Sequence, residues 1–278
     1  MEAKNTYNLR TFGLEILGIL LAVLFLIPFY FVIVNSMKSF GEILINSANM
    51  PTSLNFMNYT KVWSIMKFPQ VFLNSLLVTV FSNIGLVIIS SMAAYRLVRY
   101  PSKFNNLIFL AFVAAMVIPF QSIMIPLVRV GSQIGIMDSI PGLVICYFGF
   151  GVSLNVFLYH GFIKSIPIEV EESARVDGCS PYGVFWKIVF PLLKPMTVTV
   201  VLLNSLWIWN DFLLPMLVLS SPDLRTIPLA TFSFFGQYTK QWDLALAALV
   251  LGVLPIVIFF LAMQRHIIEG ITAGSVKG

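Results

Sequence analysis

The sequence has few charged residues for its length. Asp, Glu, Lys and Arg make up 10% of the 278 residues, hydrophobic residues make up 58%, and the mean hydropathy is +0.91. A soluble domain of this size cannot bury so large an apolar fraction. The scarcity of charge therefore excludes a soluble globular fold and indicates a membrane protein. The net charge of +5 is small and gives little support to nucleic-acid binding.

Residues and motifs that carry catalysis are also scarce. Cys146 and Cys179 belong to no C-x-x-C pattern, and His160 and His266 are isolated, so neither a disulfide nor a metal site is predicted. The sequence contains no G-x-x-x-x-G-K-[ST], H-E-x-x-H or G-x-S-x-G motif. We therefore expect that the chain is not an enzyme and binds no cofactor of its own.

The sequence does contain apolar runs that are long enough to cross a bilayer, which takes ~20 residues of helix. They cover residues 16–34, 71–94, 105–128, 139–159, 197–219 and 244–264. The first run is longer than the apolar part of a secretory signal and lacks a clear cleavage site, so we expect it to be retained. The sequence predicts an all-α integral membrane protein with six transmembrane helices, forming one domain over residues 1–278.

The distribution of Lys and Arg predicts the orientation of these helices. With the N-terminus inside, 11 of the 17 Lys and Arg residues lie on the cytoplasmic side and 6 lie outside. Positive residues in short loops are retained in the cytoplasm. We therefore expect both termini to be cytoplasmic, in a bacterial-type inner membrane. The polar segment 165–195, between the fourth and fifth runs, then also lies in the cytoplasm.

Segment 165–195 has the signals of two short helices. Pro167 suits a first helical turn, and Gly178 suits the left-handed residue that ends a helix. Ser180 can cap the start of a second helix, and Pro191 limits its length. The segment is therefore predicted to form a helix, a glycine elbow and a helix.

The same segment resembles the EAA motif of permease subunits in binding-protein-dependent ABC importers. That motif reads Glu-Ala-Ala, three residues, Gly, nine residues, Ile, one residue, Leu-Pro. The matching residues here are Glu172, Ser173, Ala174, Gly178, Ile188, Phe190 and Pro191. Ser173 replaces the first Ala and Phe190 replaces the Leu; Ser is nearly as small as Ala, so a partner can still approach closely.

Further residues are similar to the MalG-type permeases of carbohydrate importers. They are Asn74-Ser75, Ala94-Tyr95, Pro119, Ile125-Pro126, Ile166-Pro167 and the ending 270–278. The resemblance thus covers most of the chain. It implies an ATP-driven importer of a sugar, an oligosaccharide or a related polar solute, in which separate ATPase subunits bind ATP and Mg²⁺. It also implies a related second permease, hence a heterodimer, and an extracytoplasmic solute-binding protein.

The resemblance further implies that segment 165–195 is a coupling loop that docks on the ATPase. The residues expected to take part are Glu171, Glu172, Ser173, Ala174, Arg175, Asp177, Gly178 and Pro191. In the first helix Val170, Ser173 and Ala174 form a small, largely apolar face that suits a groove on a partner. The flexible tail 265–278 is expected to reach the ATPase through Gly270, Thr272, Gly274 and Lys277, unless it has no role.

A cluster in the fifth run suggests a path for the solute. Asp211 is the one acidic residue well inside an apolar run, so it should face protein or water. Aromatic and hydrogen-bonding side chains suit a hydroxyl-rich sugar, although the same side chains can instead pack structurally. The candidates are Asn204, Trp207, Asn210, Asp211 and Asn74.

Two other transport functions and one non-transport function compete with the importer. An ion-coupled secondary transporter would use an ionisable residue near the midplane, for which Asp211 is the candidate. An ABC importer for another solute, such as a glycerophosphodiester-like compound, would have the same motif. A membrane scaffold fits the composition but does not explain the spacing of the motif.

Overall fold

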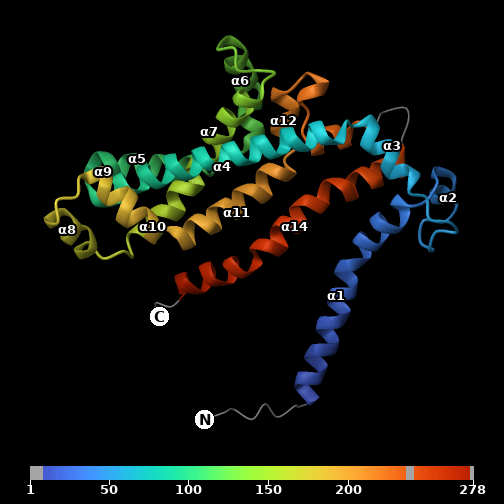
Figure 1. The fold of residues 1–278 in the computed structure, drawn as a ribbon, viewed down its shortest axis with the longest axis horizontal. Coiled ribbons are helices and arrows are strands. Elements are labelled where there is room, and N and C mark those ends of the chain that lie inside the picture. The colour runs from blue at the N-terminus through green and yellow to red at the C-terminus, as the bar shows by residue number, and fades with distance from the viewer. Residues whose placement is uncertain (1–8, 236–240, 276–278) are drawn as a thin grey trace. The chain divides into compact units, whose positions relative to one another are not determined.

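The computed structural model describes residues 9–235 and 241–275, and these form helices joined by turns, with no β-strand among them (Figure 1). This confirms the prediction of an all-α membrane chain. The contacts divide the chain into two units. One unit comprises residues 1–67 and 231–253, and the other comprises residues 68–230 and 254–278.

The first unit contains the N-terminal helix and a folded connection. Its helices are α1 (Leu9–Ser36), α2 (Phe40–Ile45) and α3 (Met57–Ile65). After α1, the buried Lys38 donates from Nζ to the carbonyl oxygens of Asn46 at 3.0 Å and Asn49 at 2.6 Å. Asn58 donates to the carbonyl oxygens of Ser36 and Lys38. These bonds fold the chain back after α1, because backbone oxygens replace the water around a buried ammonium group.

The second unit is built around three long helices. They are α4 (Phe68–Arg99), α7 (Ile140–Ile163) and α11 (Lys194–Asn210). Helix α4 packs along α7 and also contacts α11 (Figure 1). A Cβ at Gly85 would collide with the ring of Phe148, and one at Gly151 would collide with Leu86. Glycine therefore permits the close approach of α4 and α7, as small residues do in membrane helix pairs.

The same unit also contains shorter helices. They are α5 (Lys103–Ala115), α6 (Phe120–Gln133), α8 (Glu169–Val176), α9 (Pro181–Val184), α10 (Phe190–Leu192) and α12 (Leu213–Val218). Helix α13 (Ile227–Phe232) includes residues of both units. A π-helical turn covers Phe185–Val189 and a 3₁₀ turn covers Pro222–Leu224. The last helix, α14, covers Trp242–Ser275.

Four helices in the described part of the chain are long and apolar enough to cross a membrane. They are Thr11–Ser36, Phe68–Arg99, Ile140–Ile163 and Trp242–Met263. Two bent pairs raise the number to six if each pair is one span: Lys103–Ala115 with Phe120–Gln133, and Pro181–Leu192 with Lys194–Asn210. The six-span arrangement therefore stays a prediction.

The run 105–128 does not form the continuous helix that its hydropathy predicts. The helix axis bends by 105° between α5 and α6, across residues 116–119. Pro119 is the residue that caps α6, with extended backbone at φ −63° and ψ 134°. The residue before a proline disfavours the α conformation, and Ile118, which precedes Pro119, lies outside both helices. Pro126, in contrast, lies inside α6.

The run 197–219 also differs from its prediction. Helix α11 begins at Lys194 and ends at Asn210, and Asp211 is extended with ψ 131°. The chain then resumes as α12. Asp211 therefore separates two helices instead of lying within one.

The C-terminal residues differ from the predicted flexible tail. Helix α14 continues through Gly270, Thr272 and Gly274 to Ser275. No proline follows Pro255 in the sequence, so nothing removes the backbone N–H groups that extend a helix. Lys277 lies outside the described residues.

Candidate functional site

The EAA-like segment forms the predicted helix, elbow and helix. Helix α8 ends before Gly178, whose φ of +86° is the left-handed conformation that glycine adopts without strain. The hydroxyl of Ser180 accepts a hydrogen bond from the N–H of Gly183 at 3.2 Å, which caps α9. The first helix begins at Glu169, two residues later than Pro167 suggested. Local capping signals therefore predicted the turn correctly.

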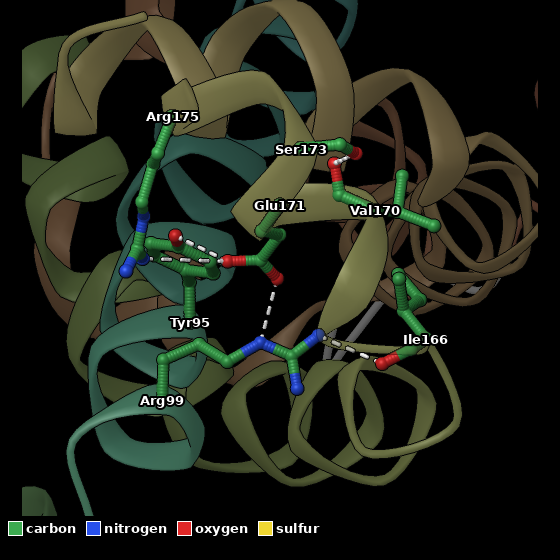
Figure 2. A network of polar contacts seen from close by, with 7 residues as sticks. All are labelled: Tyr95, Arg99, Ile166, Val170, Glu171, Ser173 and Arg175. Atoms are coloured by element: carbon green, nitrogen blue, oxygen red, sulfur yellow. Dashed lines mark hydrogen bonds and ion pairs between the residues drawn. The ribbon is translucent and has the colours of Figure 1, made fainter. Parts of the chain in front are cut away.

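Glu171 is the centre of a polar network that the sequence did not predict (Figure 2). Its side chain is 0% exposed. Arg99 donates from Nε to the Glu171 carboxylate at 2.6 Å, and the Tyr95 hydroxyl donates to it at 2.7 Å. Arg99 also donates to the carbonyl oxygen of Ile166 at 2.9 Å, and Arg175 lies 3.8 Å from the carboxylate. The network fastens α8 to the end of α4.

Aromatic packing fastens the loop to α4 a second time. The ring of Phe185, in the π-helical turn, lies 5.2 Å from the ring of Tyr95 between centroids. Phe185 is buried and also contacts the rings of Trp186 and Phe190. Tyr95 therefore holds α8 through its hydroxyl and the following turn through its ring.

This packing corrects the predicted outer face of α8. Ala174 is buried in the apolar core of the unit, and Glu171 points inward, so neither forms part of an exposed face. Val176, in contrast, is 87% exposed, and Val170 and Glu172 are also exposed. The Ser173 hydroxyl donates to the carbonyl oxygen of Glu169 at 2.9 Å within the helix.

The remaining predicted loop residues lie around α8 and after it. Arg175 and Asp177 are exposed at the end of α8, beside Gly178. Pro191 lies in α10, and the helix axis turns by 73° at Leu193, between α10 and α11. The end of α8 is therefore exposed, while the start of this helix is attached to α4.

The contacts of Tyr95 and Arg99 with Glu171 were not predicted from the sequence, although Tyr95 is among the residues that carry the family resemblance. Tyr95 and Arg99 lie four apart in α4, on one face of the helix. A tyrosine and an arginine one turn apart at the end of a predicted span were a usable signal for a buried anion. Their partner is more than 70 residues away along the chain, which spacing patterns do not reveal.

Trp207 and Asp211 line one cavity of about 470 Å³ in the second unit. The Tyr147 hydroxyl donates to Asp211 Oδ2 at 3.0 Å, and the N–H of Leu213 donates to Asp211 Oδ1 at 3.0 Å. The Trp207 ring meets the Tyr147 ring edge to face at 5.4 Å. Gln121 also lines this cavity, a position that its sequence context did not predict.

The structure does not bring the other path candidates to this cavity. Asn74 donates its amide to the carbonyl oxygens of Asp223 and Arg225, at 2.8 and 3.0 Å. Asn210 donates to the carbonyl oxygen of Leu206 in its own helix, and Asn204 is buried. Among the described residues, no group of three or more His, Cys, Asp or Glu comes together as a metal site.

The all-helical fold with long apolar helices, and the helix-elbow-helix segment that resembles the EAA motif, fit a membrane permease. The model of the family "Binding-protein-dependent transport system inner membrane component" matches residues 85–272, and the chain belongs to that family. It is therefore an inner-membrane permease component of a binding-protein-dependent importer, and its relatives are transport proteins rather than enzymes.

Several relatives match nearly the whole chain. One is the probable starch degradation products transport system permease protein AmyC of Thermoanaerobacterium thermosulfurigenes, 44% identical over 97% of this chain and 98% of its own. Another is the melibiose/raffinose/stachyose import permease protein MelC of Bacillus subtilis, 34% identical over 100% of each chain.

A solved structure has the same fold. A chain of a bacterial ABC transporter involved in the import of the acidic polysaccharide alginate matches with a TM-score of 0.78 and 21% identity. The match covers 92% of this chain and 96% of that one. The same kind of transporter, in complex with an alginate pentasaccharide-bound periplasmic protein, gives a TM-score of 0.69 at 16% identity.

Proposed function

We propose that this chain is one of two transmembrane subunits of an ATP-driven importer of oligosaccharides. It crosses the inner membrane six times with both termini in the cytoplasm, and each bent helix pair counts as one crossing. The whole chain acts as one transmembrane domain. Helix α8 then lies on the cytoplasmic side, where an ATPase can reach it.

The observation that carries this proposal is that the end of α8 is exposed while the start of the helix is attached to α4. Val176 is 87% exposed, and Val170 and Glu172 are exposed on the same short helix. Glu171 and Arg99 hold the base of that helix at 2.6 Å. A helix can transmit the movement of a partner only if it is fixed to the element that must move. An exposed apolar end with flanking charges also suits a groove on that partner.

In this mechanism ATP and Mg²⁺ are bound by separate ATPase subunits, and closure of those subunits pushes α8. The push passes through the Glu171 network to α4 and moves the spans that pack against it. A second, related permease completes the path, so the pair is a heterodimer. An extracytoplasmic binding protein delivers the solute.

The solute class follows from the relatives. The AmyC name refers to starch degradation products and the MelC name to melibiose, raffinose and stachyose. Both groups of compounds are sugars, and we assign this chain to the same chemical class. The end of α14, with Gly270, Thr272 and Gly274, and the following Lys277 are proposed to contact the ATPase.

Co-purification tests this function. The chain is expressed with its neighbouring transport subunits, extracted gently and analysed by mass spectrometry, as wild type and as Glu172→Lys. We expect an ATPase and a second permease with the wild type, and loss of the ATPase alone with the variant. Asp243→Lys, a similar charge reversal at the start of α14, is the control that should keep both partners. Recovery of the wild-type chain without any ATPase would contradict the proposal.

A further inference from the structure

Two broken helices meet at the cavity that contains Asp211. One wall comes from the break between α5 and α6, with Met116 and Phe120, and another from the break between α11 and α12, with Asp211. Helix α7 supplies the third wall through Phe150 and Ser153. Interrupted helices leave backbone and polar side chains inside a membrane protein only where they line a cavity or are buried in protein. The interruption of two spans at one place therefore suggests a binding site.

The aromatic side chains of this cavity suit the apolar face of a sugar ring. Phe120 and Phe150 meet edge to face at 5.2 Å between centroids. Trp207 is held edge to face against the buried Tyr147, so its orientation is set by packing rather than by a ligand. Indole and phenyl rings with fixed orientation offer flat surfaces to the C–H groups of a pyranose.

The polar side chains suit the hydroxyl groups of the same ring. Asp211 accepts hydrogen bonds from Tyr147 and Leu213, and an ionised carboxylate has about four acceptor sites. Among the described residues, no Lys or Arg forms an ion pair with Asp211. Gln121 and Ser153 add an amide and a hydroxyl to the lining. An anion inside an apolar span is costly unless it has such a function or a water-filled surrounding.

A second cavity in this unit, of about 520 Å³, provides a contrast. Its amide and hydroxyl donors are partly engaged: Asn83 Nδ2 donates to the Thr79 carbonyl oxygen and to Ser205, and the Tyr159 hydroxyl donates to Thr197, while Asn83 Oδ1 has no hydrogen-bond partner in the described part of the chain. The remaining lining is apolar and contains no ionisable residue. That cavity does not suit a polyhydroxylated solute, whereas the Asp211 cavity does.

We propose that the cavity around Asp211 binds one pyranose ring of the transported oligosaccharide during its passage through this subunit. This rests on the proposed function. Trp207 stacks against the ring, Asp211 accepts hydrogen bonds from two of its hydroxyl groups, and Gln121 bonds a third. The site is separate from the solute-binding protein, so it affects the passage of the sugar rather than its capture.

The test uses the assembled importer, with both permeases and the ATPase, in proteoliposomes containing ATP. Uptake of radiolabelled maltotriose and raffinose is measured at saturating binding protein, together with ATP hydrolysis in the same preparation. Loss of one hydrogen bond to a charged group predicts about tenfold less sugar imported per ATP for Asp211→Asn, and about threefold less for Gln121→Ala. ATP hydrolysis should stay within about twofold, because neither side chain belongs to the network that holds α8.

Gln133→Ala is the matched control, because Gln133 is exposed in the same helix as Gln121 but lies outside the cavity. It should import as much sugar per ATP as the wild type. If Asp211→Asn does not assemble, Gln121→Ala decides the matter, since Gln121 is exposed and its truncation removes no core packing. Wild-type sugar-to-ATP ratios in the assembled cavity variants, or equal losses of import and hydrolysis, would overturn the binding site alone. Absence of ATP-driven import of either sugar by the wild type would overturn the proposed function and the binding site with it.

Discussion

Glu171 and Asp211 are two carboxylates in the same unit, and their surroundings differ. Glu171 is fully buried and is paired with Arg99 at 2.6 Å and Tyr95 at 2.7 Å. Asp211 also receives a tyrosine hydroxyl, at 3.0 Å, but pairs with no arginine among the described residues, and it borders a cavity. A buried charge that has a full set of partners fixes two elements together, whereas one beside a cavity retains acceptors for another molecule. We therefore propose a mechanical role for Glu171 and a binding role for Asp211.

Removal of the Glu171 side chain should have the largest effect, because it weakens the attachment of the loop to α4. Glu171→Ala leaves the Arg99 side chain, which is 9% exposed, without its carboxylate partner, which costs up to about 3–5 kcal/mol in the free energy that holds the loop to α4. We expect much faster hydrogen exchange of the amides of residues 169–184, measured by mass spectrometry on the purified protein. Glu172→Ala, which truncates the exposed neighbour, should leave exchange unchanged. Equal exchange in both variants would mean that the network does not hold the loop.

Replacement of Gly178 should have a smaller effect on the same loop. A Cβ at Gly178 would meet no atom within 4 Å, so the cost of Gly178→Ala comes from the backbone alone. At φ +86° that cost is about 1–2 kcal/mol. Exchange of the amides around the elbow should rise modestly, and Gly161→Ala, at an open site inside α7, should not raise it. If the amides around the elbow exchange at the wild-type rate in Gly178→Ala, the backbone at this position tolerates a side chain.

The two tyrosines allow a direct comparison of the two carboxylates. Tyr95→Phe and Tyr147→Phe each remove one hydroxyl that donates to a carboxylate, which costs about 1 kcal/mol. Tyr95→Phe should weaken the coupling of ATP hydrolysis to transport, because the loop becomes looser. Tyr147→Phe should change sugar import per ATP and leave the exchange of residues 169–184 as it is. The opposite pattern in these two measurements would reverse the assignment of roles.

The smallest effect is expected at a third carboxylate, Asp138. It accepts hydrogen bonds from the N–H groups of Ser220 and Ser221 and from the Ser221 hydroxyl, and these bonds lower the pKa of Asp138. A lowered pKa in the folded state means that this stabilisation is present above the unfolded pKa of about 3.9 and is lost as the pH falls through the folded value. Exchange near residues 218–222 should therefore rise slightly below about pH 4. Asp138→Asn should remove that pH dependence, and a wild-type profile in the variant would contradict the assignment.

The sequence predicted those features that depend on nearby residues. Four apolar runs correspond to α1, α4, α7 and α14, because length and hydropathy determine whether a helix can cross a bilayer. Gly178 and Ser180 were identified because their capping interactions reach only a few residues along the chain. These features need no knowledge of the fold.

The features that the sequence did not predict depend on contacts between distant residues. The 105° bend between α5 and α6 lies in a continuous apolar run, and hydropathy carries no information on the direction of a helix. The inward position of Glu171 depends on Arg99, which lies 72 residues earlier. Gln121 was passed over because its neighbours in the cavity come from α7 and α11.

The most direct test of the whole account is the energy source of transport. The wild-type importer, with its second permease, ATPase and binding protein, is reconstituted in proteoliposomes, and uptake of maltotriose is measured with ATP inside and with a proton or sodium gradient instead. Uptake should require ATP and the binding protein and should not respond to either gradient. Uptake driven by an ion gradient in the absence of ATP would contradict this expectation, and would make Asp211 the candidate for ion coupling.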